Sequence, residues 1–280
     1  MDTIIGIGEA GCNLANCFAK YPQYSIYKID TDIEGRQCMA IEAQTTPEKY
    51  EEFALSTNLR SRTEKFLKDV KGEVLFIVSG AGKISGCTLA ILGQIKHCDI
   101  SILYIKPDVS LLGGTGLLQE RAVFGILQEY ARSGLFKRVW ISHNPSLESV
   151  YGDVPVIGYY DKLNELIVST MHMLNVFNNS KPVMGENFEP NEISRLSTLG
   201  IISMEEMLFF PLNNVTEKVY YYAINEEQLK TDGTLYKKIT QEIKQKREQG
   251  LKVSYRIYAT SYEDNYCYCV AHTHFIQENE

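Results

Sequence analysis

Glycines at positions 6, 8 and 11 follow the apolar first residues of the chain in the spacing Gly-x-Gly-x-x-Gly. Glycine lets a backbone turn sharply and approach an anion closely, and a helix predicted over residues 13–20 aims free N–H groups and its positive dipole end at the same place. This segment therefore predicts a site for nucleotide phosphates. Its predicted contacts are Gly8, Glu9, Ala10, Gly11, Cys12 and Asn13.

A second glycine-rich segment, residues 79–86, follows the continuous apolar run 74–78, which is typical of a strand covered on both faces. Two strand-loop-helix turns in one sheet fit a linear polyphosphate held from both sides, with the Ser85 hydroxyl as a donor and Lys83 as a positive charge. The segment is not a Walker A loop, because Ile84 follows the lysine and the first glycine is missing. Its predicted contacts are Gly80, Ala81, Gly82, Lys83, Ile84, Ser85 and Gly86.

An acidic cluster, Asp30-Thr31-Asp32, follows a second predicted strand at residues 24–29. In a dinucleotide-binding Rossmann fold an acid about 20 residues beyond the glycines holds a ribose hydroxyl, so an NAD(P)- or FAD-dependent oxidoreductase is an alternative. Such a fold needs only one phosphate turn. The second glycine loop therefore favours a nucleoside polyphosphate.

Tyr160 and Asn164 are candidates for holding a base, because residues at i and i+4 of a predicted helix point the same way. A base requires a flat apolar face together with paired donors and acceptors, and these two side chains can share one ligand. The structural alternative is a core or surface tyrosine beside a solvated asparagine. Asn144 is open to two interpretations as well, since Asn-Pro favours a turn whatever is bound nearby.

At these positions the sequence resembles the tubulin and FtsZ superfamily. Residues 8–13 are similar to tubulin's Gly-Gln-Ala-Gly-Cys-Gln, and residues 79–86 occupy the place of the family's Gly-Gly-Gly-Thr-Gly-Ser/Thr-Gly loop. Residues 30–32 and 141–144 match the Asn-Thr-Asp and Ile-Pro-Asn of FtsZ, and residues 160–171 are similar to tubulin's Tyr-Gly-Asp-Leu-Asn-His-Leu-Val-Ser-Ala-Thr-Met. The resemblance runs in order over nearly the whole chain.

The resemblance implies a GTPase that binds GTP or GDP with Mg²⁺ and polymerises head to tail, with each nucleotide between two subunits. It implies that Tyr160 stacks on guanine and that Asn164 and Asn144 touch the base. Glu9 would repel the phosphates unless Mg²⁺ lies between them, and Asp32 is the second candidate metal contact. A nucleotide-binding assembly protein without turnover is a further alternative. The short acidic tail and the distance from the cellular members suggest a phage- or plasmid-encoded member.

In this family the next subunit inserts a loop with carboxylates beside the γ-phosphate, and residues 185–192 match that loop. A helix predicted from Pro190 would place Glu189 and Glu192 on one face, where a carboxylate can position the attacking water. The structural alternative is that both side chains cap the amides at the start of that helix.

The loop departs from the family pattern. Counted from Asn164, the first family aspartate falls on Asn187 and the second carboxylate on Pro190, while Glu186 is a further candidate. Residues 111–116 lack the Glu and Arg that FtsZ uses near the ribose, and residues 43–48 lack the glycines of the γ-phosphate-sensing loop. Contacts to the sugar and to the γ-phosphate are therefore expected to differ.

The predicted elements alternate strand and helix, which indicates an α/β fold with a doubly wound parallel sheet. A long central helix at residues 159–177 and a smaller α+β unit follow, so the predicted divisions are 1–158, 159–180 and 181–280. The strands are expected at 3–8, 24–29, 74–78, 100–105, 138–142, 219–223, 251–260 and 267–275, and the helices at 13–20, 47–70, 87–96, 117–133, 159–177, 190–199 and 234–249.

Composition limits the function classes. The 280 residues are 44% hydrophobic, enough for a large core, and the net charge of −7 argues against a nucleic-acid-binding surface. No apolar segment reaches the ~20 residues that span a bilayer, so no membrane partner and a cytoplasmic protein are expected. The seven cysteines form no disulfide pattern and are expected as reduced thiols. His272 and His274 are expected to share one face of the last strand, as a structural pair.

Overall fold

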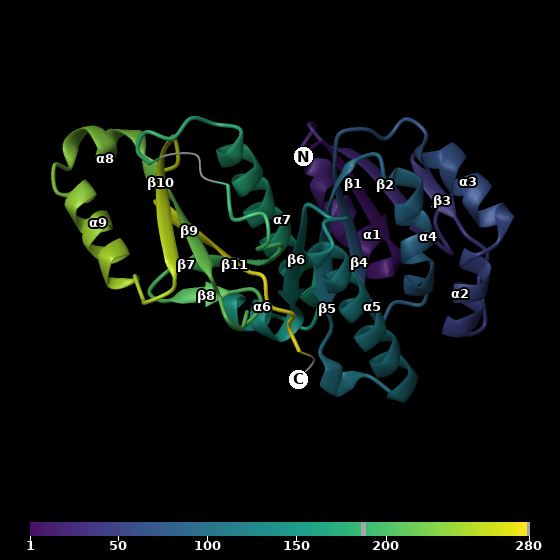
Figure 1. The fold of residues 1–280 in the computed structure, drawn as a ribbon. Coiled ribbons are helices and arrows are strands. Elements are labelled where there is room, and N and C mark those ends of the chain that lie inside the picture. Colours follow the sequence, from purple (N-terminus) through teal and green to yellow (C-terminus); the bar gives the residue numbers. More distant parts are fainter. Residues whose placement is uncertain (186–188, 279–280) are drawn as a thin grey trace.

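The computed structural model describes residues 1–185 and 189–278. In these residues the strands form one mixed sheet that runs through both halves of the chain (Figure 1). The strands are β1 (Thr3–Ile7), β2 (Ser25–Asp30), β3 (Cys38–Ala40), β4 (Glu73–Ser79), β5 (Asp99–Lys106), β6 (Arg138–His143), β7 (Leu196–Ile202), β8 (Glu206–Leu208), β9 (Glu217–Asn225), β10 (Lys252–Thr260) and β11 (Tyr266–Thr273). The helices are α1 (Gly8–Cys17), α2 (Pro47–Ala54), α3 (Thr57–Leu67), α4 (Thr88–Leu92), α5 (Gly114–Arg132), α6 (Asn144–Tyr151), α7 (Tyr159–Asn178), α8 (Glu226–Thr231) and α9 (Leu235–Gln245).

The first half of the chain is a parallel sheet in the order β3-β2-β1-β4-β5-β6. Residues 74–78 of β4 are buried on both sides, as their continuous apolar run predicts. Residues of α2, α3, α4 and α5 pack in one core against one face, and residues of α1, α6 and α7 pack in another. This is the doubly wound arrangement predicted from the sequence, and that prediction is confirmed.

Helix α7 lies between the two halves (Figure 1). Leu163 and Ile167, in its first half, pack in the same core as β1, β4 and β5. Near its end Phe177 stacks on Tyr258 of β10, with 4.5 Å between the ring centroids. The apolar stripe read from the sequence is therefore core, and it joins the parallel half to the second half.

The second half is a mixed sheet with α8 and α9. Strand β11 pairs antiparallel with both β7 and β9, and β10 pairs parallel with β9. Two residues of β6, Val139 and Trp140, pair with β7, so the sheet continues from one half into the other. The predicted divisions at residues 158 and 180 stay a prediction.

Some predicted elements are wrong. The sequence predicts a helix at residues 190–199, but residues 196–202 form β7. The prediction fails because a strand buried on both faces lacks the alternation of apolar and polar residues that would distinguish it from a helix. The expected helix at 47–70 is two helices, and Ser56 caps the second by accepting from the Leu59 amide at 3.2 Å. Helix α1 begins at Gly8, five residues before the expected Asn13. The short elements β3, β8, α6 and α8 were not predicted.

None of the described helices is both long and apolar enough to cross a bilayer. All seven cysteines are free. His272 is 3% exposed within β11, while His274 lies beyond the end of that strand and is half-buried. The two histidines therefore do not form the pair on one strand face that was expected.

Glu73, the first residue of β4, ties together the amino ends of three strands. Its carboxylate accepts hydrogen bonds from Lys137, just before β6, and from the Met1 amino group at 2.6 Å. These bonds lower the pKa of Glu73 to about 2 from an ordinary value of 4.5. A lowered pKa means that this stabilisation is complete above pH 4.5 and is lost as the pH falls towards 2.

We therefore expect Glu73→Gln to weaken the pH dependence of the free energy of unfolding between about pH 5 and pH 3, because in this window the Glu73 carboxyl takes up a proton in the unfolded chain but keeps its charge in the folded protein. Urea unfolding at both pH values measures it, with the exposed Glu263→Gln as the control. An equal decline in parent and Glu73→Gln would show that the contact does not contribute.

Candidate functional site

The two predicted glycine loops lie side by side at one edge of the sheet. Strands β1 and β4 are parallel neighbours in the register Gly6↔Ile77, so the loops after their carboxyl ends meet at the same edge. A Cβ placed on Gly8 would lie 3.6 Å from a side-chain carbon of Ile84, so the two loops approach each other closely at this point. In an open α/β sheet, ligands bind outside the carboxyl ends of the strands.

The first loop leads directly into α1. Gly8 has a φ of +71°, which glycine adopts without strain, and no side chain caps the helix. The first amides of a helix have no partner within it, so the N–H groups of Gly8, Glu9 and Ala10 are available to an anion. Glu9, Ala10 and Asn13 are exposed, as contacts to a ligand require.

Two predicted contacts of the first loop have structural roles. A Cβ on Gly11 would lie 2.6 Å from the Ile77 carbonyl oxygen, so glycine is needed there for α1 to pack against β4. The Cys12 thiol donates to the carbonyl oxygens of Gly6 at 3.4 Å and Ile29 at 3.5 Å. Burial, with a contribution from the Asp30 charge, raises the pKa of Cys12 to about 12. The Cys12 side chain therefore faces the core, and only its backbone is free to serve a ligand.

The second loop corrects the prediction for Ser85. Ser85 is 4% exposed, and its hydroxyl donates to the Gly80 carbonyl oxygen at 2.9 Å, so the proton expected to reach a phosphate is used inside the loop. Lys83 is exposed and stays a candidate positive charge, together with the backbone of Ala81, whereas the Gly82 amide donates to the Ser79 carbonyl oxygen inside the loop. Gly86 lies against α2, where an added Cβ would be 3.1 Å from the Glu51 Cγ atom.

The predicted base contacts lie on two adjoining helices. Asn144 is the first residue of α6, and Tyr160 and Asn164 occupy the first two turns of α7. Tyr159 ties the helices together by donating to Glu148 Oε2 at 3.0 Å, and partial burial with that bond raises the pKa of Tyr159 to about 12. Tyr160 is 64% exposed, so its ring is open for stacking.

The residues that would hold Mg²⁺ are few. Glu9 in the first turn of α1 and Asp32, just after β2, are both exposed near the same sheet edge. In the part of the chain that the structure describes, no three His, Cys, Asp or Glu side chains gather as a metal site. Because Mg²⁺ in nucleotide sites takes one or two carboxylates plus phosphate oxygens, these two residues fit the ion only together with a nucleotide.

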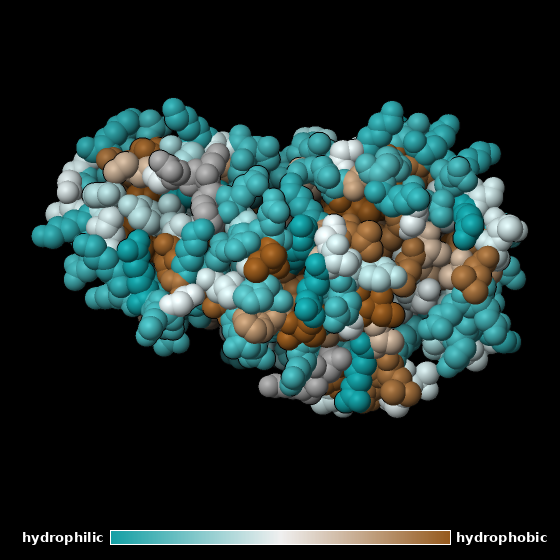
Figure 2. Space-filling model, viewed as in Figure 1, coloured by the Kyte–Doolittle hydropathy of each residue, from teal (hydrophilic) through white to brown (hydrophobic). Residues whose placement is uncertain are grey.

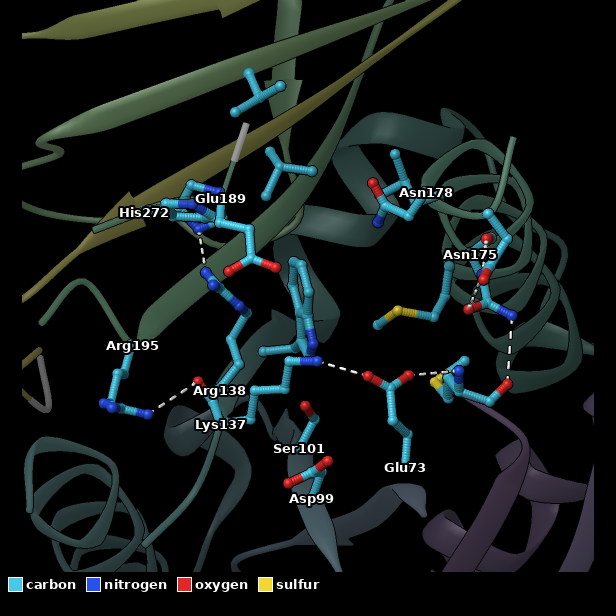
Figure 3. Close-up of a pocket in the computed structure, with 18 of the residues that line it drawn as sticks. Glu73, Asp99, Ser101, Lys137, Arg138, Asn175, Asn178, Glu189, Arg195 and His272 are labelled. Atoms are coloured by element: carbon cyan, nitrogen blue, oxygen red, sulfur yellow. Dashed lines mark hydrogen bonds and ion pairs between the residues drawn. The ribbon is translucent and has the colours of Figure 1, made fainter. Parts of the chain in front are cut away.

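The candidate catalytic carboxylates lie at the opposite edge of the sheet. Glu189 and Glu192 line a cavity of about 560 Å³ whose wall includes Glu73, Asp99 and Arg138, the first residues of β4, β5 and β6. Figure 3 shows the Glu189 carboxylate in this cavity, near Arg138. The glycine loops follow the carboxyl ends of the strands, so one chain does not bring its own carboxylates to its own loops.

The local structure around these carboxylates differs from the prediction. No helix begins at Pro190. The Asn191 amide donates to Glu217 Oε1 at 3.0 Å, and a turn leads from there into β7. Both the shared helix face and the capping alternative for Glu189 and Glu192 are therefore wrong. The predictions for Glu186 and Asn187 lie outside the described residues.

Solved structures with this architecture are found among known proteins, although no protein-family model matches the sequence and no curated protein matches it. CetZ from Methanosaeta thermophila is 13% identical, with a TM-score of 0.71 over 98% of this chain and 87% of that one. The GTPγS-form protofilament of TubZ from Bacillus thuringiensis is 16% identical, with a TM-score of 0.70 over 96% and 86%. FtsZ from M. jannaschii, solved as an empty dimer, is 12% identical, with a TM-score of 0.67 over 98% and 88%.

The chain has the tubulin/FtsZ fold. The resemblance of the sequence to that family is thereby supported across almost the full length of the chain. At these low identities the likeness establishes the fold and leaves the residues of the site to be tested one by one.

Sequence reasoning missed the polar cluster in the cavity of this tubulin/FtsZ fold. Arg138 Nη1 donates to Ser197 Oγ at 2.9 Å and to His272 Nδ1 at 2.6 Å. Burial lowers the pKa of Arg138 to about 10 and, with the nearby Arg138 charge, holds the pKa of His272 well below its usual value. The three residues belong to β6, β7 and β11, so no motif in the sequence could have joined them.

The close approach of Gly11 to the Ile77 carbonyl allows a test of how α1 packs against β4. We expect Gly11→Val to lower the stability by about 1–3 kcal/mol, because its side chain would collide with the Ile77 carbonyl, a backbone atom that cannot move aside easily. Thermal unfolding followed by circular dichroism measures it. The control is Gly125→Ala in α5, where an added Cβ has no atom within 4 Å. A Gly11 variant as stable as the parent would contradict the packing described.

Proposed function

We propose that this protein is a GTPase that assembles head to tail with copies of itself. The observation that supports this most is the separation of the glycine loops and the candidate carboxylates onto opposite edges of one sheet. Stacking one subunit's amino edge on the next subunit's carboxyl edge brings Glu189 or Glu192 to a neighbour's nucleotide. The reaction is attack of water on the γ-phosphate, which releases phosphate and leaves GDP.

In this proposal each part of the carboxyl edge has a role. The uncapped start of α1 and the loop at residues 79–86 offer N–H groups to the phosphates, and the Lys83 charge adds to them. Tyr160 stacks on guanine, and Asn164 and Asn144 bind its edge. Mg²⁺ held by Glu9 and Asp32 would offset the repulsion between carboxylate and phosphates.

The surface near that edge fits contact with a second copy. Four apolar side chains are strongly exposed, Leu111 and Leu118 at 80% and 67%, and Val156 and Ile157 at 92% and 94%. The second pair lies just before α7, next to Tyr160; of the first pair, Leu111 lies just before α5 and Leu118 lies in its second turn. Apolar side chains gather on the half of the molecule that carries α4 and α5, whereas the surface over α8 and α9 is mostly hydrophilic (Figure 2). Exposed apolar patches of this kind mark interaction sites.

Similar structures of known proteins support the same proposal. The TubZ structure is a protofilament in its GTPγS form, and CetZ2 from Haloferax volcanii, 13% identical with a TM-score of 0.71, is a GTPγS-bound protofilament. We place the protein in the cytoplasm, where its seven free thiols would remain reduced. Neither nucleic acid nor a membrane is a required partner in this proposal.

We expect isothermal titration calorimetry to detect GTP binding that depends on Mg²⁺. Tyr160→Ala should weaken it about tenfold through lost stacking, and Asn164→Ala by a similar factor through lost hydrogen bonds. Tyr151→Ala, an exposed tyrosine at the end of α6, is the matched control and should bind as the parent does. Binding of NADH without binding of GTP would instead support the dinucleotide-dependent oxidoreductase.

Completion of the site by a neighbour is tested by mixing variants. Glu189→Ala or Glu192→Ala should keep GTP affinity and slow phosphate release on the order of a hundredfold, the usual effect of losing one positioned general base. Asn164→Ala should release little phosphate because it binds GTP poorly. Mixed together, the Asn164 variant supplies the carboxylates for GTP on the other subunit, so part of the turnover should return.

The exposed Glu263→Ala is the control for the carboxylate variants and should leave phosphate release unchanged. Right-angle light scattering in the same samples reports assembly with GTP, GDP and a non-hydrolysable analogue. Unchanged phosphate release in both carboxylate variants would remove Glu189 and Glu192 from the reaction. Assembly of the parent without any phosphate release would show a GTP-binding assembly protein instead of a GTPase.

A further inference from the structure

The loop at residues 79–86 turns carbonyl oxygens towards the protein interior. Gln119, a residue of α5, donates through Nε2 to the Gly82 carbonyl oxygen at 3.1 Å and to Ser85 Oγ at 2.8 Å. Ser85 Oγ in turn donates to the Gly80 carbonyl oxygen at 2.9 Å. A side chain from a separate helix therefore holds the inner side of the loop.

Three amide donors of the same loop are not used by hydrogen bonds within the described protein. The N–H groups of Ala81, Lys83 and Ile84 have no hydrogen-bond acceptor in the part of the chain that the structure describes, whereas the Gly82 amide donates to the Ser79 carbonyl oxygen at 3.3 Å. Successive N–H groups without a protein acceptor form the kind of concavity that binds an anion. Holding the carbonyl groups inward thus leaves these donors for a ligand.

Glu120, the next residue of α5, supports the loop through Tyr104. It is fully buried, and its Oε1 atom accepts from Lys106 Nζ at 2.8 Å and from the Tyr104 hydroxyl at 3.1 Å. The Tyr104 hydroxyl lies against Gly80, where an added Cβ would be 2.0 Å from it. A buried ion pair adds little net stability, because both charges leave water, but this one fixes the tyrosine on which the loop rests.

We propose that Gln119 and Glu120 are positioning residues for phosphate binding, which hold the loop at residues 79–86 in the shape that presents its amides. The proposal rests on the proposed nucleotide site, and neither residue touches the ligand. It adds α5 to the phosphate-binding machinery, to which the sequence assigned only the two glycine segments and their own helices.

The experiment compares Gln119→Leu with Gln128→Leu. Gln128 is a matched control, because it is also a glutamine of α5 that makes two hydrogen bonds, to the Gln277 carbonyl oxygen at 3.1 Å and from the Gln277 amide at 2.7 Å, away from the loop. Calorimetry is done with GTP, GDP and guanosine. We expect Gln119→Leu to weaken GTP and GDP binding about tenfold, the loss of one or two hydrogen bonds, and to leave guanosine binding unchanged. Gln128→Leu should change none of the three.

Guanosine separates positioning from general damage, because it has the base and sugar but no phosphate. Equal losses for GTP and guanosine in Gln119→Leu would overturn the proposal, and so would unchanged binding of all three. Hydrogen exchange of residues 79–86 without nucleotide is the second measurement, and it should become faster in Gln119→Leu and not in Gln128→Leu. If the parent binds no guanine nucleotide, the proposed function fails, and exchange still decides whether Gln119 holds the loop; equal exchange in parent and Gln119→Leu would reject that role.

Discussion

The parallel pairing of β1 with β4 is the contact on which the rest of the site depends. It places the two glycine segments, residues 6–11 and 79–86, at one edge, where Gly8 approaches Ile84 closely. The pairing requires α1 to lie close against β4, and the glycine at position 11 makes that approach possible. An anion at this edge meets amides from both loops and the positive end of a helix dipole, whose effects add because they point at the same place.

The continuous sheet then keeps the glycine loops and the candidate carboxylates, Glu189 and Glu192, at opposite edges. Because β6 pairs with β7, and α7 packs on strands of both halves, the residues at 189–192 lie beside the amino edge of the parallel sheet, where the Asn191 amide donates to Glu217. A bend between the halves would have to break the stacking of Phe177 on Tyr258 and the pairing of two strands. Under the proposed function, a carboxylate at one edge therefore meets a phosphate at the other only across two molecules.

The local parts of this arrangement could be predicted from the sequence. Glycine spacing and apolar runs are short-range signals, so the two loops, the parallel strands and α7 were recovered. The errors have physical causes. Buried β7 has no alternation of apolar and polar residues. The Ser85 hydroxyl donates to the Gly80 carbonyl oxygen, and the sequence of the loop does not show that this oxygen is the acceptor. Arg138 and His272 are 134 positions apart, and only the folded sheet brings them together.

Glu9 shows how an empty and a filled site place different demands on one residue. In the first turn of α1, its carboxylate interacts favourably with the positive end of the helix dipole, which stabilises the helix start when no phosphate is present. With a polyphosphate at the same amides, the carboxylate becomes a like charge in the same field, and its effect changes sign. A divalent cation between carboxylate and phosphate restores the attraction on both sides. In the proposed nucleotide site, the charge that favours the loop without a ligand therefore makes nucleotide binding depend on Mg²⁺.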